Sequence, residues 1–206
     1  LGFRDFAIPP KAFIKGNQIY RYIKGYLGEK NFRDLKKPML IPVTNLFTSE
    51  EVVLREGEVA RAVRASLSIP GIFAPALLNH QHFIDGGVSN PLPVHTLREV
   101  GVKKVIAVNV IPSPEDYREK HAVYTRKKEE MEMKLQDKHG PSKWFYLLSK
   151  RIRKKFSTNI FNVLMNTIQF MEYTVARLQG MDADVVIHPI VLDSNWAEVY
   201  NPKKFI

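Results

Sequence analysis

The sequence predicts an α/β fold, because amphipathic helix patterns are twice followed by short apolar runs. The first helix pattern begins after Asn90, a good helix cap, and ends at Gly101, and residues 102–110 then form an almost uninterrupted apolar run. The second helix pattern covers about residues 159–179 and precedes the apolar run 184–188. Such runs are typical of strands buried on both faces of a parallel sheet. We therefore expect helices packed against a mainly parallel sheet.

Two elements are predicted near the beginning of the chain. Asn17 can cap an amphipathic helix, and Gly28 can end it. Residues 39–43 form a short apolar strand pattern, in which Pro42 favours a strand end or an edge strand because proline cannot donate a hydrogen bond. This opening region is therefore predicted to be a surface helix followed by a strand.

A further strand and a further helix are predicted between residue 43 and Asp85. Residues 52–54 are the strand candidate, and residues 58–66 have valines and alanines at helical spacing. In that helix we expect Arg61 and Arg64 to face solvent. A turn rich in Asn, His and Gln should then lead to the apolar pair before Asp85.

Composition excludes several classes of protein. The chain has 206 residues, of which 45% are hydrophobic and 25% charged, as in an ordinary globular domain. It has no cysteine, which excludes disulfides, thiolate nucleophiles and cysteine-bound metal within the chain. The sequence shows no signal-peptide pattern and no apolar run long enough to span a bilayer. We expect a cytoplasmic protein that lies, if at all, peripherally on a membrane.

The net charge of +10 is concentrated in one segment. Residues 118–155 carry 13 basic and 5 acidic residues, so most of the excess positive charge lies there. Within them, residues 142–156 place aromatic and aliphatic side chains at helical spacing among basic ones, which suits the surface of an anionic membrane. A solvated charged face is the equal alternative. Nucleic acid is not expected, because no recognised motif accompanies the charge. The membrane-binding candidates are Trp144, Phe145, Lys150, Arg151, Arg153, Lys154 and Lys155.

The motif with most chemical content is Asp85-Gly86-Gly87. Alone it reads as a turn, because Asp-Gly pairs are common turn formers. Its context is more specific: residues 64–75 read RASLSIPGIFAP, and residues 83–94 read FIDGGVSNPLPV. In this order the two stretches resemble the second half of the patatin-like phospholipases, in the bacterial branch that is similar to neuropathy target esterase. Residues 16–38 and 173–187 also look like parts of that family.

The resemblance implies a three-layer α/β/α patatin-like hydrolase with a mainly parallel central sheet. It also implies a Ser-Asp dyad without metal or cofactor, in which a serine attacks an acyl ester and the aspartate of the D-G-G motif serves the proton transfer. Asp85 matches that aspartate, with Gly86 and Gly87 shaping its turn. A serine needs such a base, and an aspartate serves better when partial burial raises its pKa.

The sequence departs from the family at the nucleophile. The family's G-x-S-x-G elbow and glycine-rich oxyanion loop do not occur in the 206 residues. Ser66 and Ser68 are near Asp85 in sequence, but we expect them to pack against the D-G-G turn. We therefore expect residues 1–206 to be the carboxy-terminal portion of one patatin-like domain, with a basic amphipathic insertion at about residues 115–158, and its missing amino-terminal part to be a partner.

A metal site at His80 and His82 is a further candidate, since alternate residues of a strand share a face. Asp85 would face the other way unless the chain turned there, so a solvated turn is the favoured reading and no metal is expected. The leading functional prediction is a serine acyl hydrolase acting on phospholipid, lysophospholipid or related esters. The alternative is a non-catalytic lipid or membrane-binding module on the same scaffold.

Overall fold

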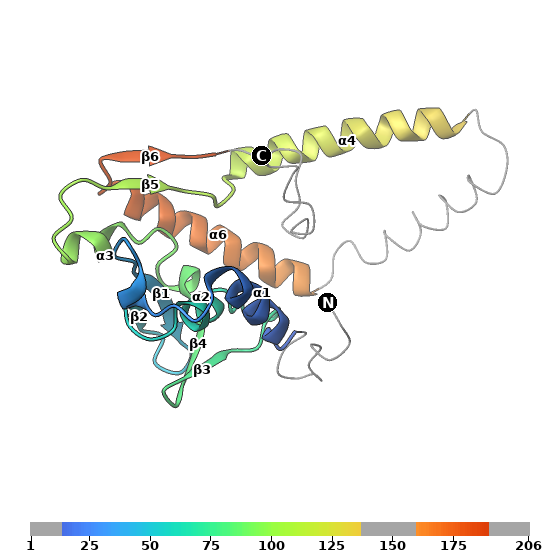
Figure 1. Cartoon of the computed structure of the whole chain (residues 1–206). Coiled ribbons are helices and arrows are strands. Elements are labelled where there is room, and N and C mark those ends of the chain that lie inside the picture. The colour runs from blue at the N-terminus through green and yellow to red at the C-terminus, as the bar shows by residue number, and fades with distance from the viewer. Residues whose placement is uncertain (1–13, 137–159, 190–206) are drawn as a thin grey trace. The chain divides into compact units, whose positions relative to one another are not determined.

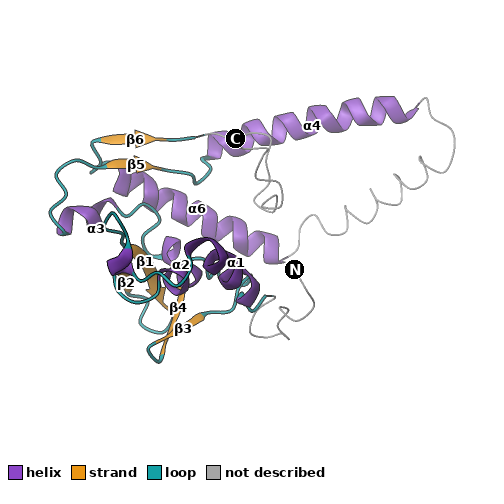
Figure 2. Cartoon of the chain, in the orientation of Figure 1, coloured by secondary structure: helices purple, strands orange, loops and turns teal. Residues whose placement is uncertain are grey.

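The computed structural model describes residues 14–136 and 160–189, in which helices and strands follow one another along the chain (Figures 1 and 2). The chain divides into two compact units. The first contains residues 1–107 and 171–186, and the second contains residues 108–170 and 187–206. The predicted α/β class is confirmed.

The first unit holds most of the regular structure. Its helices and strands continue up to a six-residue helix that follows the D-G-G turn. In chain order they are α1 (Asn17–Leu27), η2 (Phe32–Asp34), β1 (Ile41–Asn45), β2 (Glu51–Leu54), α2 (Val59–Ser66), β3 (Ala76–Leu78), β4 (Gln81–Asp85), η3 (Gly86–Val88) and α3 (Val94–Glu99).

The remaining elements extend into the second unit. A long helix follows the fifth strand, and the division between the units passes through β5, α6 and β6. These elements are β5 (Ile106–Val108), α4 (Pro114–Gln136), α6 (Ile160–Gly180) and β6 (Val185–Ile187).

The sheet of the first unit is antiparallel, so the expectation of a mainly parallel sheet is wrong for it. Its four strands lie in the order β2-β1-β4-β3, and each pair of neighbours is antiparallel. The connections explain two of these pairs: the residues between β1 and β2, and the Asn79-His80 pair between β3 and β4, are too short for a parallel crossover. Both turn residues have positive φ, at 47° and 63°, as tight hairpins require.

Pro42 lies near the start of the central strand β1, so of the two expected positions the strand end is correct and the edge strand is not. It pairs with Val53 of β2, and the ladder between β1 and β4 begins only at Val43, which pairs with Asp85. The proline is therefore tolerated because it precedes the second ladder. Its carbonyl oxygen remains useful as an acceptor and receives a hydrogen bond from the Ser66 hydroxyl at 2.9 Å.

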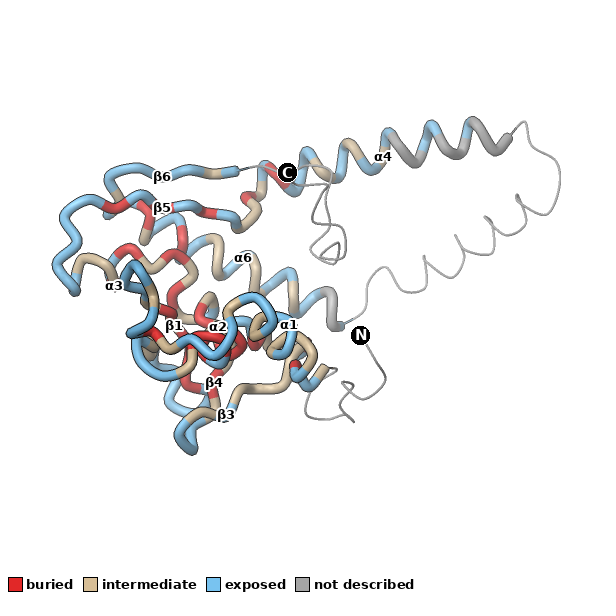
Figure 3. Tube along the Cα trace, viewed as in Figure 1, coloured by how far each residue is buried: buried red, intermediate tan, exposed pale blue. Residues whose placement is uncertain are grey.

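The apolar core lies where α2 covers the sheet, as the buried stretches of Figure 3 show. Val43, Ala65 and Phe83 form one buried cluster on β1, α2 and β4. A second cluster joins the other half of α2 to β1 and η2, and its buried members are Phe32, Ile41, Val59 and Ala62. Burial of these side chains stabilises the first unit because each is removed from water.

Arg64 is buried, although the sequence pattern placed it in solvent with Arg61. Only 8% of Arg64 is exposed. Its Nε donates to the Gly16 carbonyl at 3.1 Å, and its Nη2 donates to the carbonyls of Lys15 and Ala74 at 2.8 and 2.9 Å. The guanidinium therefore satisfies three backbone oxygens from two distant segments, which a solvent-facing arginine would not do.

Asn17 and Asn90 do not cap helices as expected. Asn17 is the first residue of α1, and Gly16 occupies the cap position with φ of 83°. Asn90 is buried before the start of α3, and its Nδ2 donates to Glu51 at 2.7 Å and to Thr96 at 3.0 Å. The buried asparagine thus joins β2 to α3 instead of beginning a helix.

Strands β5 and β6 pair as a separate two-stranded sheet and are not buried on both faces. Ile106 of β5 is 66% exposed, and all three residues of β6 are exposed. The apolar composition of these runs predicted strands correctly. The prediction that both faces of these strands are buried is wrong within the described part of the chain.

In the second unit, residues 113–116 begin α4 with a reciprocal pair of hydrogen bonds. The Ser113 amide donates to Asp116 Oδ2 at 2.6 Å, and the Asp116 amide donates to the Ser113 hydroxyl at 3.1 Å. His188 joins this cap: its Nε2 lies 2.8 Å from Asp116 Oδ2, and its Nδ1 lies 2.8 Å from the Asn109 carbonyl. Both ring nitrogens face acceptors, so the charged imidazolium satisfies both contacts.

Replacing Arg64 by alanine should lower the free energy of unfolding by roughly 2–4 kcal/mol, because buried carbonyl oxygens lose their donor. Arg61→Ala on the same helix is the matched control: that side chain is 62% exposed and pairs with Glu58, so less than about 1 kcal/mol should be lost. Denaturant unfolding of the two variants measures the difference. Equal losses would contradict the structural role of Arg64.

The His188–Asp116 pair should make stability pH-dependent. The hydrogen bond to Asp116 raises the pKa of His188 above 6.5, against the opposing effect of burial. Because the folded-state pKa is raised, the stabilisation is fully present below pH 6.5 and is lost as the pH rises through the folded-state value. His188→Gln should therefore be destabilised relative to the parent at pH 5.5 but much less at pH 8.5, as thermal unfolding would measure. A pH-independent difference would contradict this.

Candidate active site

The D-G-G turn follows β4 in the first unit. Asp85 is the last residue of β4, and Gly86 and Gly87 open the short helix η3. The pairing of Asp85 with Val43 places it beside the central strand β1. The sequence prediction that Asp85 lies where a strand ends in a glycine turn is thus matched by the structure.

The backbone of Asp85 is fixed on both sides. Its amide donates to the Ser68 carbonyl at 3.0 Å, and its carbonyl accepts a hydrogen bond from the Thr44 hydroxyl at 2.9 Å. The same hydroxyl lies 2.8 Å from that of Ser89, just after the turn. The position of the Asp85 backbone is therefore fixed by three parts of the chain: the 64–75 stretch, the central strand and the turn itself.

Ser66 and Ser68 have structural contacts. The Ser68 side chain is fully buried, and its Oγ receives a hydrogen bond from Arg64 at 2.6 Å. The Ser66 hydroxyl donates to Pro42, as described above. Both hydroxyls are thus engaged near the turn, as the sequence predicted for serines that pack against it.

The two glycines of the turn have different neighbours. A Cβ at Gly86 would overlap the Pro42 carbonyl, so the close approach of β1 excludes a side chain. A Cβ at Gly87 would lie 3.2 Å from Asp85 Oδ1 and 3.5 Å from Glu172 Oε1. Gly86 therefore permits the packing of the turn, whereas Gly87 keeps space open beside two carboxyl groups.

The Asp85 carboxyl group is partly buried, and one of its oxygens is hydrogen-bonded. Burial raises its pKa above the usual 3.8, and a hydrogen bond from the Gly87 amide to Oδ1, at 2.8 Å, partly opposes that rise. Within residues 14–136 and 160–189 no hydrogen bond to Oδ2 is found. Oδ2 is therefore the oxygen available to accept a proton from a reacting group.

Glu172 was missed by sequence reasoning. It lies on α6, and burial together with the charge of Asp85 raises its pKa to about 7. The signal was present in the sequence: Glu172 is four residues before Ala176, so both lie on one face of the helix. A glutamate in an amphipathic pattern is ordinarily assigned to solvent, so the pattern alone did not identify Glu172 as a partly buried residue.

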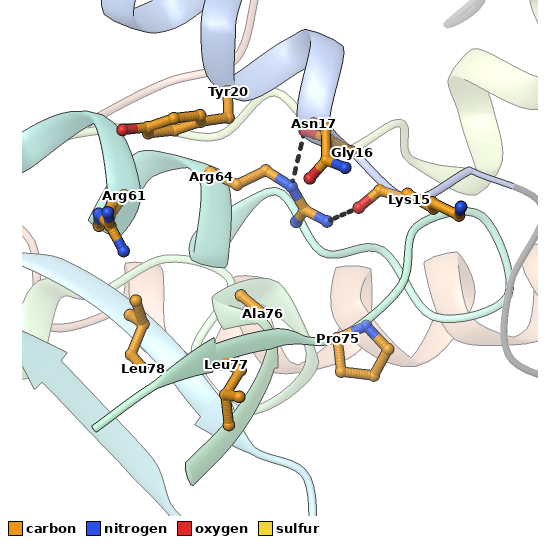
Figure 4. A pocket seen from close by; sticks show the side chains of 10 residues that line it. All are labelled: Lys15, Gly16, Asn17, Tyr20, Arg61, Arg64, Pro75, Ala76, Leu77 and Leu78. Atoms are coloured by element: carbon orange, nitrogen blue, oxygen red, sulfur yellow. Dashed lines mark hydrogen bonds between the residues drawn. The ribbon is translucent and has the colours of Figure 1, made fainter. Parts of the chain in front are cut away.

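A pocket of about 280 Å³ lies on another part of the first unit, among α1, α2 and β3 (Figure 4). The residues that line it include Lys15, Tyr20, Arg61 and Leu77. Figure 4 shows Arg64 reaching the backbone at the rim of the pocket. Asp85 does not contribute to this pocket. It is therefore separate from the candidate active site.

His80 and His82 do not gather with Asp85. His80 is exposed in the turn between β3 and β4, and the His82 ring meets the Phe47 ring edge-on at 5.6 Å between centroids. Across the described ranges, no three His, Asp or Glu side chains come close enough to hold a metal ion.

The membrane-binding candidates from Trp144 to Lys155 lie outside the described residues, as does the whole 142–156 segment. Of the basic region, the structure describes α4, whose helix reaches Gln136. No helix in the described part of the chain is both long enough and apolar enough to cross a membrane.

Comparison with known proteins finds similar proteins in the NTE family. An NTE family protein of Mycobacterium bovis is 31% identical over 106 residues, which cover 52% of this chain and 18% of the relative. Lysophospholipase NTE1 of Cryptococcus neoformans is 31% identical over 117 residues, or 55% of this chain and 7% of the relative. The chain therefore spans less than a fifth of either relative.

A second NTE family protein of Mycobacterium bovis is 27% identical over 106 residues, covering 52% of this chain and 29% of the relative. The family model of patatin-like phospholipases matches residues 2–98, which include the 64–75 stretch and the D-G-G turn. Through these residues, the chain is similar to the patatin-like phospholipase family.

Proposed function

We propose that this chain supplies the aspartate of a Ser-Asp dyad in a serine acyl hydrolase. The observation that carries the proposal is the environment of Asp85: its backbone is fixed, its pKa is raised by burial, and its Oδ2 is available within the described residues. The similarity of residues 2–98 to the patatin-like phospholipases supports lipid ester hydrolysis as the reaction. Phospholipid, lysophospholipid or a related ester is the proposed substrate.

The chemistry assigns Asp85 one task. A serine hydroxyl is a weak nucleophile until a base removes its proton, and a carboxylate with a raised pKa accepts that proton more readily. The same carboxyl group can then return the proton to the departing alcohol. Rigid anchoring of Asp85 helps, because the base must lie within hydrogen-bond distance of the attacking hydroxyl.

The nucleophile and the oxyanion donors are proposed to lie in an amino-terminal part of the same protein. The exposed apolar strands β5 and β6 support this proposal, since Ile106 and Val108 and all of β6 would otherwise remain in contact with water. We propose that this amino-terminal part pairs with or covers these strands in the intact enzyme.

Asp85→Asn in the protein that includes this amino-terminal part should lower the hydrolysis of a short p-nitrophenyl ester at least about 100-fold, because the amide cannot accept the serine proton. Asp182→Asn, at an exposed turn after α6, is the matched control and should retain activity. Circular dichroism should show both variants folded. Near-normal turnover by a folded Asp85→Asn variant would exclude Asp85 as the base.

We also propose that residues 142–156 bring the enzyme to anionic membranes. The support is the sequence pattern alone: aromatic and basic side chains alternate around a predicted helix. A membrane-bound enzyme would meet lipid esters at the bilayer surface. We also propose a cytoplasmic location with peripheral membrane contact.

Vesicle flotation tests this contact. The chain should float with vesicles that contain phosphatidylserine and should not float with neutral phosphatidylcholine vesicles. A variant with the five basic residues of 150–155 replaced by glutamine should lose most of the binding, with a matched control in which the basic residues of 118–128 are replaced. Equal flotation of all three proteins would contradict the proposal.

A further inference from the structure

Glu172 lies on the face of α6 that packs against the first unit. One turn further along that face, Ala176 has no exposed surface, and Gly180 is buried against Leu92. Gln179 also points to this side, because its Oε1 accepts a hydrogen bond from the Leu92 amide at 3.0 Å. The end of α6 is thus held against the residues just after the D-G-G turn, and Glu172 is held with it.

The same face brings Glu172 to Gly87. The position of a Cβ at that glycine would be 3.2 Å from Asp85 Oδ1 and 3.5 Å from Glu172 Oε1. The two carboxyl oxygens are therefore within about 7 Å of each other, a distance at which like charges in a partly buried site repel appreciably. Gly87 leaves the space between them free of protein side chain.

This arrangement makes double ionisation costly. Burial first, and the Asp85 charge second, raise the pKa of Glu172 from 4.5 to about 7. Asp85 also has a raised pKa, from burial, but it accepts the Gly87 hydrogen bond that favours its charged form. Asp85 therefore loses its proton first, and Glu172 keeps its proton until the pH approaches about 7.

Other ionisable side chains on the surrounding elements are directed elsewhere. Arg64 on α2 binds backbone carbonyls and the Ser68 hydroxyl, and His82 on β4 packs against Phe47. On α6, Tyr173 and Arg177 are one and five residues from Glu172, so the helix turns them toward other directions. Strand β1 and η3 contain no ionisable residue.

We propose that Glu172 is a positioning residue for Asp85: it keeps the carboxyl pair singly charged in mildly acidic solution, and its ionisation makes Asp85 a stronger proton acceptor at higher pH. This inference rests on the proposed function of Asp85. Glu172 does not itself accept the serine proton. It acts through its charge, which a glutamine at the same position would lack while filling the same volume.

The consequence is a two-step pH dependence. Activity first rises as Asp85 ionises. It rises again around pH 7, where Glu172 loses its proton and the added negative charge favours proton transfer to Asp85. Folding shows the opposite trend: because the folded-state pKa of Glu172 is raised, its contribution to stability is lost as the pH rises from 4.5 through about 7.

Carboxyl NMR titration of the 206-residue chain tests the coupling without any need for activity. Glu172 should titrate near pH 7, and Asp85→Asn should lower its midpoint by about half a pH unit or more, because the repelling charge is removed. The midpoint should remain above 4.5 in that variant, since burial still acts. An unchanged midpoint in Asp85→Asn would overturn the coupling, whatever the enzyme's activity.

Kinetics of the intact esterase test the positioning role. Glu172→Gln should remain active at pH 6 and lose the second rise around pH 7, whereas Glu56→Gln, at an exposed glutamate of the same unit, should keep it. A profile for Glu172→Gln identical to that of the parent would overturn the role. A folded Glu172→Gln variant as inactive as Asp85→Asn would also overturn it, because Glu172 would then be required for the chemistry itself.

Discussion

The first unit depends on the buried guanidinium of Arg64. It joins the segment before α1 to the segment after α2 through backbone carbonyls. It also donates to the hydroxyl of Ser68, whose own carbonyl accepts a hydrogen bond from the Asp85 amide. Burying a charged group is favourable only when its donors are satisfied, and here three carbonyls and a hydroxyl accept them. Because several segments meet at one planar group, they cannot shift independently. The position of the candidate base is thereby fixed by a residue that does not touch its carboxyl group.

The strand end and the turn at Asp85 could be predicted from the sequence, because the motif is local. An apolar pair followed by Asp-Gly-Gly specifies a strand end and a tight turn, and β4 and η3 are found there. What the motif could not reveal was its distant support. Arg64 shares a helix with Arg61, and the two differ only in what the rest of the fold presents to them: one meets the carbonyls of Lys15 and Gly16, the other meets Glu58 near solvent. Periodicity assigns every arginine to the outside because it contains no information about acceptors from other segments.

The errors in strand direction and burial have a related cause. An apolar run such as residues 102–110 indicates a strand, but direction follows from the connections and burial follows from neighbouring strands. The connections from β1 to β2 and from β3 to β4 are short, so these two pairs are antiparallel. Around β5 the described neighbour is β6, and the apolar side chains of both strands remain exposed. The apolar side chains of β5 and β6 are therefore less buried by residues 14–136 and 160–189 than their composition would favour. This accords with the proposed amino-terminal part.

Glu172 illustrates how a site can contradict a local rule for a functional reason. A glutamate on the packed face of a helix, beside another carboxyl group, lowers stability whenever both groups are ionised. A glutamine would avoid that cost and fill the same space, and an apolar residue would pack as well. The glutamate gives the site something neither replacement offers: a charge that appears near neutral pH next to a proposed base. Departures from the most stable choice are expected where a fold holds reactive groups, and the pair of Asp85 and Glu172 across Gly87 fits that expectation.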